Sequence, residues 1–351
     1  MEKFEVLSDP KKIYRKMLED INNAKESIYL ETYIYGDDKI GKLFRDALTK
    51  KAINGVKVKL LIDAWGSPRI KKGFFQKLTD FGGQVKFFKE IRYVIRLLSK
   101  NHERNHRKLL IIDKKITYIG SINITSECIN WRELSLRIRG PIAEHFTYSF
   151  QKSWNIHGKL TKTKIKSMIH KGFEIINDIP SDAKKLTESR YANLINSAKK
   201  QILIETPYFV PPIRLRRALA KAVKRGVDVK ILLPFISDLR FIDMIRNRYL
   251  GSLHRKGIKI YYYLPKTLHS KLLLVDDKFF LFGSSNLDYR SFIHQHEINL
   301  FGKDKNINYE LCKFFTLGIK NSKPFNYKTW KNRSSLTKII ELFLSYISYY
   351  L

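Results

Sequence analysis

The sequence predicts an α/β protein of two similar modules, each a mixed sheet flanked by helices, packed with pseudo-two-fold symmetry. The first observation is an internal repeat, because residues 21–32 read INNAKESIYLET and residues 195–206 read INSAKKQILIET. Further matches follow in the same order, and the last relates residues 106–123 to residues 269–286. Co-linear matches at drifting spacing indicate duplication of one module. The second observation is that apolar, strand-like runs alternate with helical stretches in both copies, which is typical of α/β layers.

Each copy has the same order of predicted elements. A helix leads into a buried apolar strand that ends in Glu-Thr, and a second helix follows. This second helix ends at Gly55 or Gly226, since glycine favours helix C-termini. After another apolar strand and further helical sequence, two strands surround a histidine segment. The predicted helices are 14–23, 40–54, 189–197 and 215–225, and the closing strands are 108–112, 116–119, 271–275 and 279–282.

The repeat also sets the predicted domain boundaries. Residues 1–156 form the first module, the polar and Lys-rich residues 157–188 a connection, and residues 189–351 the second module with a C-terminal helix. Apolar residues in the tail recur at helical spacing, which favours a packed helix over a membrane anchor. These residues are Leu336, Ile339, Ile340, Phe343, Leu344 and Ile347.

Composition restricts the class of partner. The chain has 351 residues, 44% of them apolar, which suffices for two cores and excludes intrinsic disorder as the main state. Lys and Arg number 67 against 33 Asp and Glu, a formal net charge of +34. Such a charge favours a polyanion, namely nucleic acid, an anionic membrane surface or a phosphorylated substrate. Compositional drift towards Lys, Ile and Asn is the alternative explanation.

Cysteines and apolar stretches restrict the compartment. Cys128 and Cys312 form no CxxC pair, so we expect neither a disulfide framework nor a zinc cluster, and a reducing cytosol fits. The N-terminus has no apolar segment of signal-peptide length, and no stretch reaches the length of a membrane span. We therefore expect peripheral membrane contact at most, and no metal or other cofactor.

One pattern that carries chemistry occurs once in each copy. It is His-x-Lys, four residues, Asp, six residues, then Gly-Ser-x-Asn. The matching residues are His106, Lys108, Asp113, Ser121 and Asn123 in the first copy, and His269, Lys271, Asp276, Ser284 and Asn286 in the second. A lone His-x-Lys is typical of a surface strand, but two full patterns at equivalent points of a duplicated module leave little room for coincidence.

The spacing suits phosphate chemistry. In an extended segment, residues i and i+2 face the same side, so each His and its Lys project together. The ammonium group can neutralise a phosphate oxygen, while the imidazole attacks phosphorus or protonates a leaving oxygen. The Gly-Ser-x-Asn turn offers short donors that can approach phosphate oxygens.

The double pattern resembles the signature of the phospholipase D superfamily, and the resemblance covers nearly the whole chain. More narrowly, the sequence is similar to the bacterial cardiolipin synthases of that superfamily, although it lacks the two N-terminal membrane spans that many of them carry. The supporting stretches are residues 63–67 (DAWGS), 105–108 (NHRK), 131–133 (WRE), 205–211 (ETPYFVP) and 286–291 (NLDYRS).

The resemblance implies a two-step transfer through a phosphohistidine, without metal. It implies that Glu297 orients His106 and that Glu133 orients His269, each acid serving the opposite half. We expect His106 to be the nucleophile and His269 the general acid and base. Two asymmetries favour this assignment: Arg104 and Arg107 add charge near the first motif, and the aromatic stretch 261–265 precedes the second.

Several features have weaker interpretations. Although they belong to the motif, Asp113 and Asp276 are better interpreted as turn residues beside the site. His102, His294 and His296 are expected in loops or at the pocket rim, and residues 295–297 (QHE) depart from the Asn before Phe-Glu found in many relatives. The amphipathic segment 91–100 fits an interfacial helix and a plain packed helix equally well.

The predicted function is a phosphatidyltransferase, with cardiolipin synthase as the narrower form. The alternatives are a phospholipase D hydrolase and a phosphodiesterase or nuclease acting on nucleic acid, and a non-catalytic binding module ranks last because both histidines and both lysines are present. The expected partners are anionic phospholipids and a membrane surface, with no obligatory protein partner and with nucleic acid as the lesser alternative. The expected location is the cytoplasmic side of a bacterial cell membrane, peripherally bound.

Overall fold

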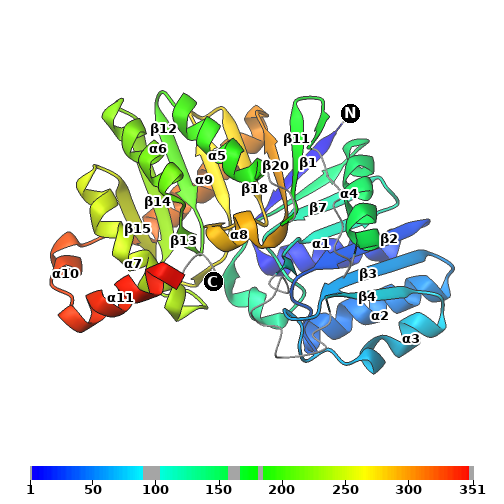
Figure 1. Cartoon of the computed structure of the whole chain (residues 1–351). Coiled ribbons are helices and arrows are strands. Elements are labelled where there is room, and N and C mark those ends of the chain that lie inside the picture. Colours follow the sequence, from blue (N-terminus) through cyan, green and yellow to red (C-terminus); the bar gives the residue numbers. More distant parts are fainter. Residues whose placement is uncertain (1, 90–102, 157–166, 181–184, 348–351) are drawn as a thin grey trace.

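Two sheets, each with helices on its outer face, lie side by side in the protein (Figure 1). The computed structural model describes residues 2–89, 103–156, 167–180 and 185–347. The first sheet belongs to the N-terminal module, drawn from blue to teal in Figure 1, and the second to the C-terminal module, drawn from green to red. The amphipathic segment 91–100 and His102, both singled out in the sequence, lie outside the described residues.

The first module is a mixed seven-stranded sheet in the order β1-β9-β7-β6-β2-β3-β4. Strands β2, β3 and β4 are parallel, and the rest pair antiparallel. The strands are β1 (Lys3–Leu7), β2 (Ser27–Thr32), β3 (Lys57–Asp63), β4 (Gln84–Phe88), β6 (Leu109–Ile112), β7 (Ile116–Gly120) and β9 (Ser135–Arg139), with the short β5 (Arg104–Asn105) and β8 (Trp131–Arg132) outside this sheet. The helices are α1 (Pro10–Asn23), α2 (Lys39–Ile53), α3 (Gln76–Asp80) and α4 (Ile142–Ile156), and the 3₁₀ turns are Lys72–Phe75 and Ser126–Asn130.

The second module repeats that order. Its larger sheet runs β10-β11-β20-β18-β17-β12-β14-β15-β21, and the seven strands from β11 to β15 match those of the first sheet one for one. The strands are β10 (Met168–His170), β11 (Phe173–Asp178), β12 (Gln201–Glu205), β13 (Phe209–Val210), β14 (Asp228–Pro234), β15 (Lys259–Tyr263), β16 (Thr267–Leu268), β17 (Leu272–Val275), β18 (Phe279–Gly283), β19 (Leu287–Asp288), β20 (Gln295–Gly302) and β21 (Ser322–Pro324). The helices are α5 (Leu186–Ser197), α6 (Ile213–Lys224), α7 (Arg240–Arg255), α8 (Tyr289–Ile293), α9 (Lys305–Lys320), α10 (Tyr327–Lys331) and α11 (Ser335–Ile347). The predicted duplication is therefore confirmed strand by strand.

The interval 157–188, expected as a connection, contains part of the second sheet. Strands β10 and β11 lie within it, and β11 pairs with β20 as β1 pairs with β9. The second module thus begins at β11 in the fold, earlier than residue 189. The apolar residues Phe173, Ile175 and Ile176 are buried there, but the surrounding lysines concealed this short apolar pattern in the sequence.

The predicted helices are present, and the largest shift in a boundary is at α1. This helix begins at Pro10 instead of residue 14, after Asp9, whose side chain accepts a hydrogen bond from the Lys11 backbone N–H. Asp followed by Pro is a start signal, because proline suits the first helical turn. Helix α5 likewise begins at Leu186 instead of residue 189.

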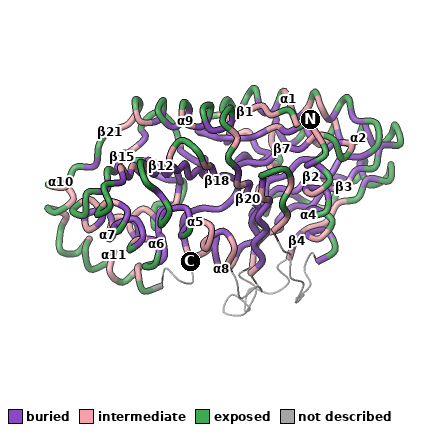
Figure 2. Tube along the Cα trace, turned by 90° about the horizontal axis from the view of Figure 1, so that it is seen from above, coloured by how far each residue is buried: buried purple, intermediate pink, exposed green. Residues whose placement is uncertain are grey.

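A single core joins the two modules. It lies between the sheets and takes side chains from both, together with Phe146 and Phe150 of α4 and Leu311 and Phe315 of α9. Each half has one further large core under its own outer helices. The buried segments fill the middle of the molecule from one half to the other (Figure 2). Burial of this shared apolar layer fixes the modules face to face, as predicted, with pseudo-two-fold symmetry.

Helix α11 departs from the expectation of a packed face. Leu336, Ile339 and Phe343, expected to pack inward, are more than 60% exposed, whereas Glu341 is 1% exposed. No helix among residues 2–89, 103–156, 167–180 and 185–347 combines the length and apolar character needed to cross a bilayer.

Candidate active site

The two motif histidines are held at the junction of the modules by exchanged strands. Strand β5, from the first half, pairs with β20 of the second, and β8 of the first half pairs with β16 of the second. Beside these pairings the His106 backbone N–H donates to the His296 carbonyl at 3.0 Å, and the His269 N–H donates to the Arg132 carbonyl at 3.0 Å. Each histidine therefore depends on a backbone hydrogen bond with the opposite module.

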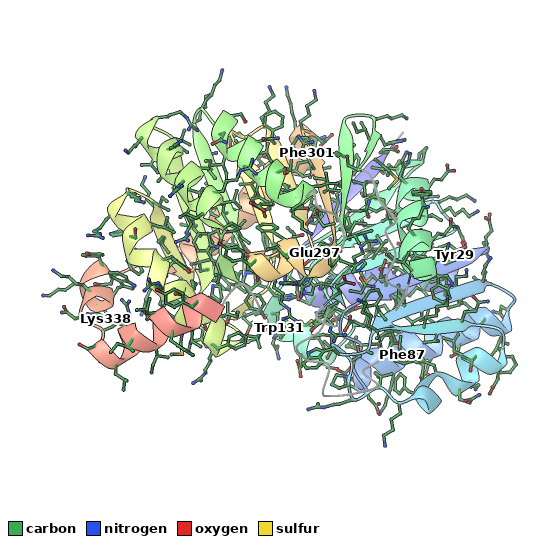
Figure 3. All side chains as sticks on the ribbon, viewed as in Figure 1. Tyr29, Phe87, Trp131, Glu297, Phe301 and Lys338 are labelled. Carbon is green, nitrogen blue, oxygen red and sulfur yellow. The ribbon has the colours of Figure 1, made fainter. Side chains whose placement is uncertain are left out.

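The exchanged strands also deliver the orienting acids. Glu297 follows His296 directly, and its Oε1 lies 2.9 Å from Nδ1 of His106. Glu133 follows Arg132 in the same way, with Oε1 2.8 Å from Nδ1 of His269. This crossed arrangement is the one that the resemblance implied. Glu297 and the neighbouring Trp131 lie between the two halves in Figure 3. Since Nδ1 is engaged, Nε2 is the nitrogen left for chemistry.

Two serines of the motif hold these acids. The Ser121 hydroxyl donates to Glu133, and the Ser284 hydroxyl donates to Glu297. The same hydroxyl oxygens accept hydrogen bonds from the backbone N–H groups of Leu134 at 3.1 Å and of Ile298 at 2.9 Å. Of the two roles expected for these serines, substrate binding or orientation, the contacts favour orientation, because their protons are committed to the carboxylates.

The motif asparagines face the cavity between the modules. Asn123 accepts a hydrogen bond from the Ile34 N–H through its Oδ1 at 3.1 Å. Asn286 has a buried Oδ1 that finds no hydrogen-bond partner within the described part of the chain. Both residues line the cavity. Of the Gly-Ser-x-Asn turn, the asparagines are thus the groups placed to meet a substrate.

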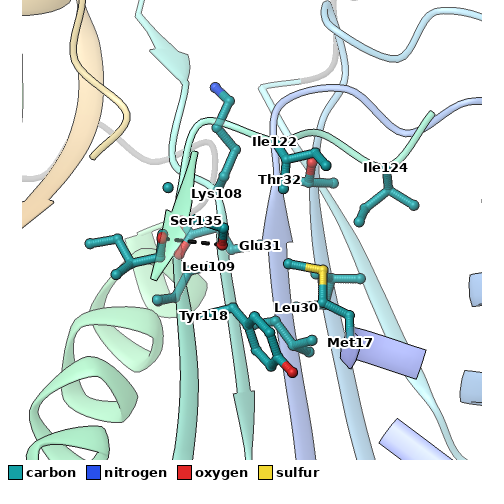
Figure 4. A pocket seen from close by; sticks show the side chains of 13 residues that line it. Met17, Leu30, Glu31, Thr32, Lys108, Leu109, Tyr118, Ile122, Ile124 and Ser135 are labelled. Carbon is teal, nitrogen blue, oxygen red and sulfur yellow. Dashed lines mark hydrogen bonds between the residues drawn. The ribbon is translucent and has the colours of Figure 1, made fainter. Parts of the chain in front are cut away.

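The motif lysines are buried beside their histidines. Nζ of Lys108 donates to the His106 carbonyl at 2.6 Å, and Nζ of Lys271 donates to the His269 carbonyl at 2.5 Å. In Figure 4, Lys108 extends away from the apolar side chains of Met17 and Leu30 in the first module. Burial lowers the pKa of Lys108 well below its usual value, with the charge of Lys271 as the next cause, and burial lowers the pKa of Lys271 to about 8. An anion between these two cations would relieve their mutual repulsion.

The two histidine–glutamate pairs differ electrostatically. Burial, followed by the charges of Lys108 and Lys271, lowers the pKa of His106 well below its usual value, and burial raises the pKa of Glu297 to about 8. Burial also lowers the pKa of His269, but the charge of Glu133 opposes that shift. Burial alone would raise the pKa of Glu133, yet its contacts with His269, Lys271 and Ser121 together outweigh burial and the net pKa is lowered. The second pair is therefore the more ionic one.

Asp113 and Asp276, counted with the catalytic motif, lie elsewhere. Each begins the tight turn after β6 or β17 with a positive φ, of 51° and 57°. The Asp113 carboxylate accepts hydrogen bonds from the backbone N–H groups of residues 25–27, and that of Asp276 from residues 199–201. Six residues lie between each His and its Asp, which separates the two by roughly 20 Å along an extended strand. Asp113 and Asp276 therefore stabilise turns, and they lie too far from the histidines to belong to the catalytic group.

Of the features that favoured His106 as nucleophile, Arg104 lies beside the cavity wall, whereas Arg107 and the aromatic stretch do not face the cavity. Arg107 points to the other side of the strand from His106, where its guanidinium donates to Ser153 of α4 at 2.5 Å. Arg104 lies 5.2 Å over the ring of Trp65, a residue of the cavity wall. The aromatic stretch 261–265 belongs to β15 and its end and does not line the cavity.

Both histidines open into one cavity of about 380 Å³ between the modules. Tyr33, Ile34 and Trp65 form its first-module wall. The second module contributes a larger, mostly apolar wall from β13, the loop before α7, α7 itself and α8. These residues are Tyr208, Val210, Asp238, Leu239, Phe241, Ile242, Ile245, Tyr289 and Arg290.

Aromatic groups beside the histidines were not assigned from the sequence. The ring of Tyr33 meets His106 edge-on at 5.1 Å, and that of Trp131 meets His269 at 4.9 Å. Tyr208 donates from its hydroxyl to Asp238 at 2.8 Å in the cavity wall. The signal was present, because Trp131 and Tyr208 belong to stretches that carried the family resemblance. Of the other histidines, His296 is buried against Phe88 rather than at a rim, since it occupies the place of Arg132 in the repeat.

Comparison with known proteins gives the family. A family model described as "Cardiolipin synthase, PLD-like domain" matches residues 17–154 and 191–317. The chain belongs to this family. It is 33% identical over 352 residues to the major cardiolipin synthase ClsA of Bacillus subtilis, covering 96% of this chain and 73% of that one. A cardiolipin synthase of Clostridium perfringens strain SM101 is 34% identical, covering 97% and 75%.

A solved structure supports the fold of this cardiolipin synthase-like chain. Phosphatidylserine synthase of Haemophilus influenzae Rd KW20 superposes with a TM-score of 0.77 at 15% identity, covering 99% of this chain and 95% of that one. With the family model and its relatives, the chain is an enzyme of the phospholipase D type in the phosphatidyltransferase class. The two segments of the family model coincide with the two modules of the fold.

Proposed function

We propose that this chain transfers a phosphatidyl group from one phosphatidylglycerol to the glycerol hydroxyl of another, which yields cardiolipin and glycerol. The observation that carries the proposal is the single cavity lined by His106 and His269, each held through Nδ1 by a glutamate of the opposite module. Relatives at 33% and 34% identity over nearly the whole chain are cardiolipin synthases, which supports this pair of substrates.

The proposed reaction has two balanced steps. Nε2 of one histidine attacks phosphorus, the bond from phosphorus to the headgroup oxygen breaks, and the other imidazole donates its Nε2 proton to that oxygen. The second imidazole then takes the proton of the incoming hydroxyl, whose oxygen attacks phosphorus while the P–N bond breaks. Lys108 and Lys271 neutralise the phosphate oxygens during both steps.

The electrostatic asymmetry supports His106 as the nucleophile and His269 as the general acid and base. An attacking imidazole must be neutral, and burial beside two ammonium groups keeps the pKa of His106 well below its usual value. Burial lowers the pKa of His269 as well, but the Glu133 carboxylate opposes that shift, so of the two imidazoles His269 is the one that retains a proton more readily. This reasoning replaces the Arg107 and residues 261–265 arguments, which the geometry removed.

The proposed partner is an anionic phospholipid surface, contacted peripherally. The net charge of +34 favours anionic lipid, and long-chain substrates reach the cavity from a bilayer. The two cysteines are free thiols, which suits the reducing cytoplasmic side of a bacterial membrane. The apolar wall of Val210, Ile242 and Ile245 favours an acyl-bearing substrate over nucleic acid.

The test is incubation of the purified chain with phosphatidylglycerol vesicles, followed by lipid mass spectrometry. The expected products are cardiolipin and glycerol in equal amounts. Phosphatidic acid in place of cardiolipin would assign the chain to hydrolysis, and cleavage of single-stranded DNA with no lipid product would assign it to nucleic acid. His106→Ala protein is the control for contaminating activity.

A further inference from the structure

Helix α11 has its apolar side outward. Leu336, Ile339, Ile340, Phe343 and Tyr346 are exposed, and they follow the i, i+3, i+4, i+7 spacing of a single helical stripe. Their exposed fractions are 67%, 62%, 38%, 65% and 74%. An ordinary surface helix buries such a stripe, so this arrangement needs a partner outside the described chain.

The inward side of the same helix is anchored by a charge pair. Glu341 is buried, and its carboxylate accepts two hydrogen bonds from Arg333, at 2.8 and 2.7 Å. The Arg333 guanidinium in turn lies 4.2 Å over the ring of Trp330. Trp330 donates from its indole N–H to the Asn247 carbonyl of α7 at 2.6 Å. These contacts hold α11 in one orientation, so the outward stripe is a fixed surface.

Helix α11 packs directly on the wall of the active-site cavity. Leu344, on the inner side of α11, packs against Val210, Ile242 and Ile245, which line that cavity. Next to Arg333 and Trp330 runs a groove that Phe235 and Ile236 also line, both more than half exposed. The helix that carries the stripe therefore rests on the cavity wall, and the loop before α7 adds exposed apolar groups beside the groove.

The charges around the helix match an anionic surface. From residue 321 to the C-terminus the chain has Lys323, Lys328, Lys331, Arg333 and Lys338 against one acid, Glu341. That acid is buried and paired with Arg333, so the remaining exposed charge of the described part of this segment is positive. Lys338 extends from α11 at the edge of the molecule (Figure 3).

We propose that the outward stripe of α11 inserts into the interfacial region of an anionic phospholipid bilayer and sets the cavity mouth against it. The helix has 13 residues, a length of about 20 Å at the α-helical rise, which suits a helix lying in the membrane plane. Apolar side chains then enter the acyl boundary while the lysines meet lipid phosphates. This inference rests on the proposed function, because only a lipid substrate requires the active-site cavity to open towards a bilayer.

The experiment compares two paired substitutions. Ile339→Ser with Phe343→Ser removes apolar area from the stripe, and Tyr309→Ser with Leu317→Ser removes it from exposed positions of α9. Helix α9 lies on the opposite edge of the molecule from α11 in Figure 2. Cosedimentation with vesicles of equal parts phosphatidylglycerol and phosphatidylcholine gives a partition coefficient for each protein. We expect a fall of about tenfold per substituted residue on α11 and a change below about twofold on α9.

A second variant tests insertion without loss of apolar character. Relative to the wild-type chain, which has four tryptophans of its own, Phe343→Trp should add a blue-shifted emission on vesicle addition and further quenching by brominated acyl chains, whereas Tyr309→Trp should add neither. Unchanged partition of the Ile339→Ser and Phe343→Ser protein, or an unquenched Trp at 343, would overturn the proposal. Conversion of a wild-type dimer to a monomer by the same substitutions, with vesicle binding intact, would assign the stripe to a second copy instead.

Binding and turnover separate this inference from the proposed function. If the wild-type chain binds vesicles through α11 but makes no cardiolipin, the proposed function fails and the membrane surface stands. If it makes cardiolipin from vesicles at the same rate with and without the α11 substitutions, the membrane surface fails and the function stands. A monomeric short-chain phosphatidylglycerol, below its critical micelle concentration, should be turned over equally by both proteins.

Discussion

The two modules share a framework but not an environment. Both have the same order of seven strands, the same buried His and Lys, and the same serine-held glutamate given to the opposite half. They differ in what surrounds that framework. The second module supplies most of the cavity wall, and its Glu297 has a raised pKa whereas Glu133 of the first module has a lowered one. Duplication thus provides two equivalent imidazoles in different surroundings, and the proposed division of roles between them rests on that difference.

The largest expected effect comes from replacing the histidines one at a time. His106→Ala and His269→Ala should each lower turnover by on the order of 10³-fold or more, since a nucleophile or a general acid is lost. A donor with a good leaving group separates them, because attack then needs no proton. His269→Ala should accumulate a phosphatidyl adduct, detected by peptide mass spectrometry, and His106→Ala none. An adduct mapped to His269 in the wild-type chain would reverse the roles.

The glutamates should differ in their pH dependence. Because the folded pKa of Glu297 is raised to about 8, the folded state binds its proton more tightly and is destabilised as pH rises from about 4.5 to 8. Glu297→Gln should therefore gain thermal stability relative to wild type over that range. The pKa of Glu133 is lowered in the folded state, so its carboxylate stabilises the fold at pH values above its unfolded pKa. Glu133→Gln should therefore lower the free energy of unfolding at neutral pH, and lower it less below about pH 4.

Both glutamine variants should also lose activity, by on the order of 10²-fold or more, because the imidazole tautomer is no longer fixed. Thermal melts of the wild-type, Glu297→Gln and Glu133→Gln proteins between pH 4.5 and 8.5 measure how the stability of each depends on pH. Parallel melting curves for the two variants would mean that the two pairs are electrostatically equal, contrary to the assignment of roles.

A smaller effect is expected at Asp238, in the second-module wall. Its charge raises the pKa of His269, although burial and Lys271 lower it overall. Asp238→Asn should therefore shift the alkaline limb of the kcat profile to lower pH, since His269 must be protonated to act as an acid. Asp304→Asn, at the start of α9, is the matched control. A shift in the acid limb instead would indicate that His269 acts first as a base.

The smallest effect on turnover is expected at the turn aspartates. Asp113→Ala and Asp276→Ala each remove a carboxylate that caps three backbone N–H groups, so each should cost about 1 kcal/mol of unfolding free energy. Their lowered pKa values mean that this contribution is lost as pH falls below about 4. Urea unfolding measures the loss. A drop of kcat beyond about threefold in folded protein would return these residues to the catalytic group.

Much of the fold could be predicted because each copy of the repeat has local sequence patterns that identify its strands and helices. Apolar runs and glycine ends located the strands and helices, and motif spacing located both histidines and lysines. Strand β11 was missed because six residues among lysines carry too weak a pattern. The sequence left open whether Ser121 and Ser284 bind substrate or orient an acid, because nothing in it indicates which acceptor a hydroxyl donor meets. The cavity wall from α7 depends on long-range packing that no local pattern encodes.

The inverted face of α11 shows the same limit, since helical periodicity identifies a stripe but not the side on which it lies. Leu336 and Phe343 have the spacing of a buried face, and only the position of Glu341 beneath the helix shows that it is turned outward.

The strand exchange at β5 and β8 has a consequence for synthesis of the chain on the ribosome. The acid that orients His106 is residue 297, so an N-terminal fragment, however well folded, has an unoriented imidazole. The acid that orients His269 is residue 133, so a C-terminal fragment is equally incomplete. The nascent protein therefore cannot begin to consume membrane lipid until the last strand of the second sheet core has emerged and docked. The pairing of each histidine with a glutamate of the other module therefore makes activity depend on both modules being folded and docked.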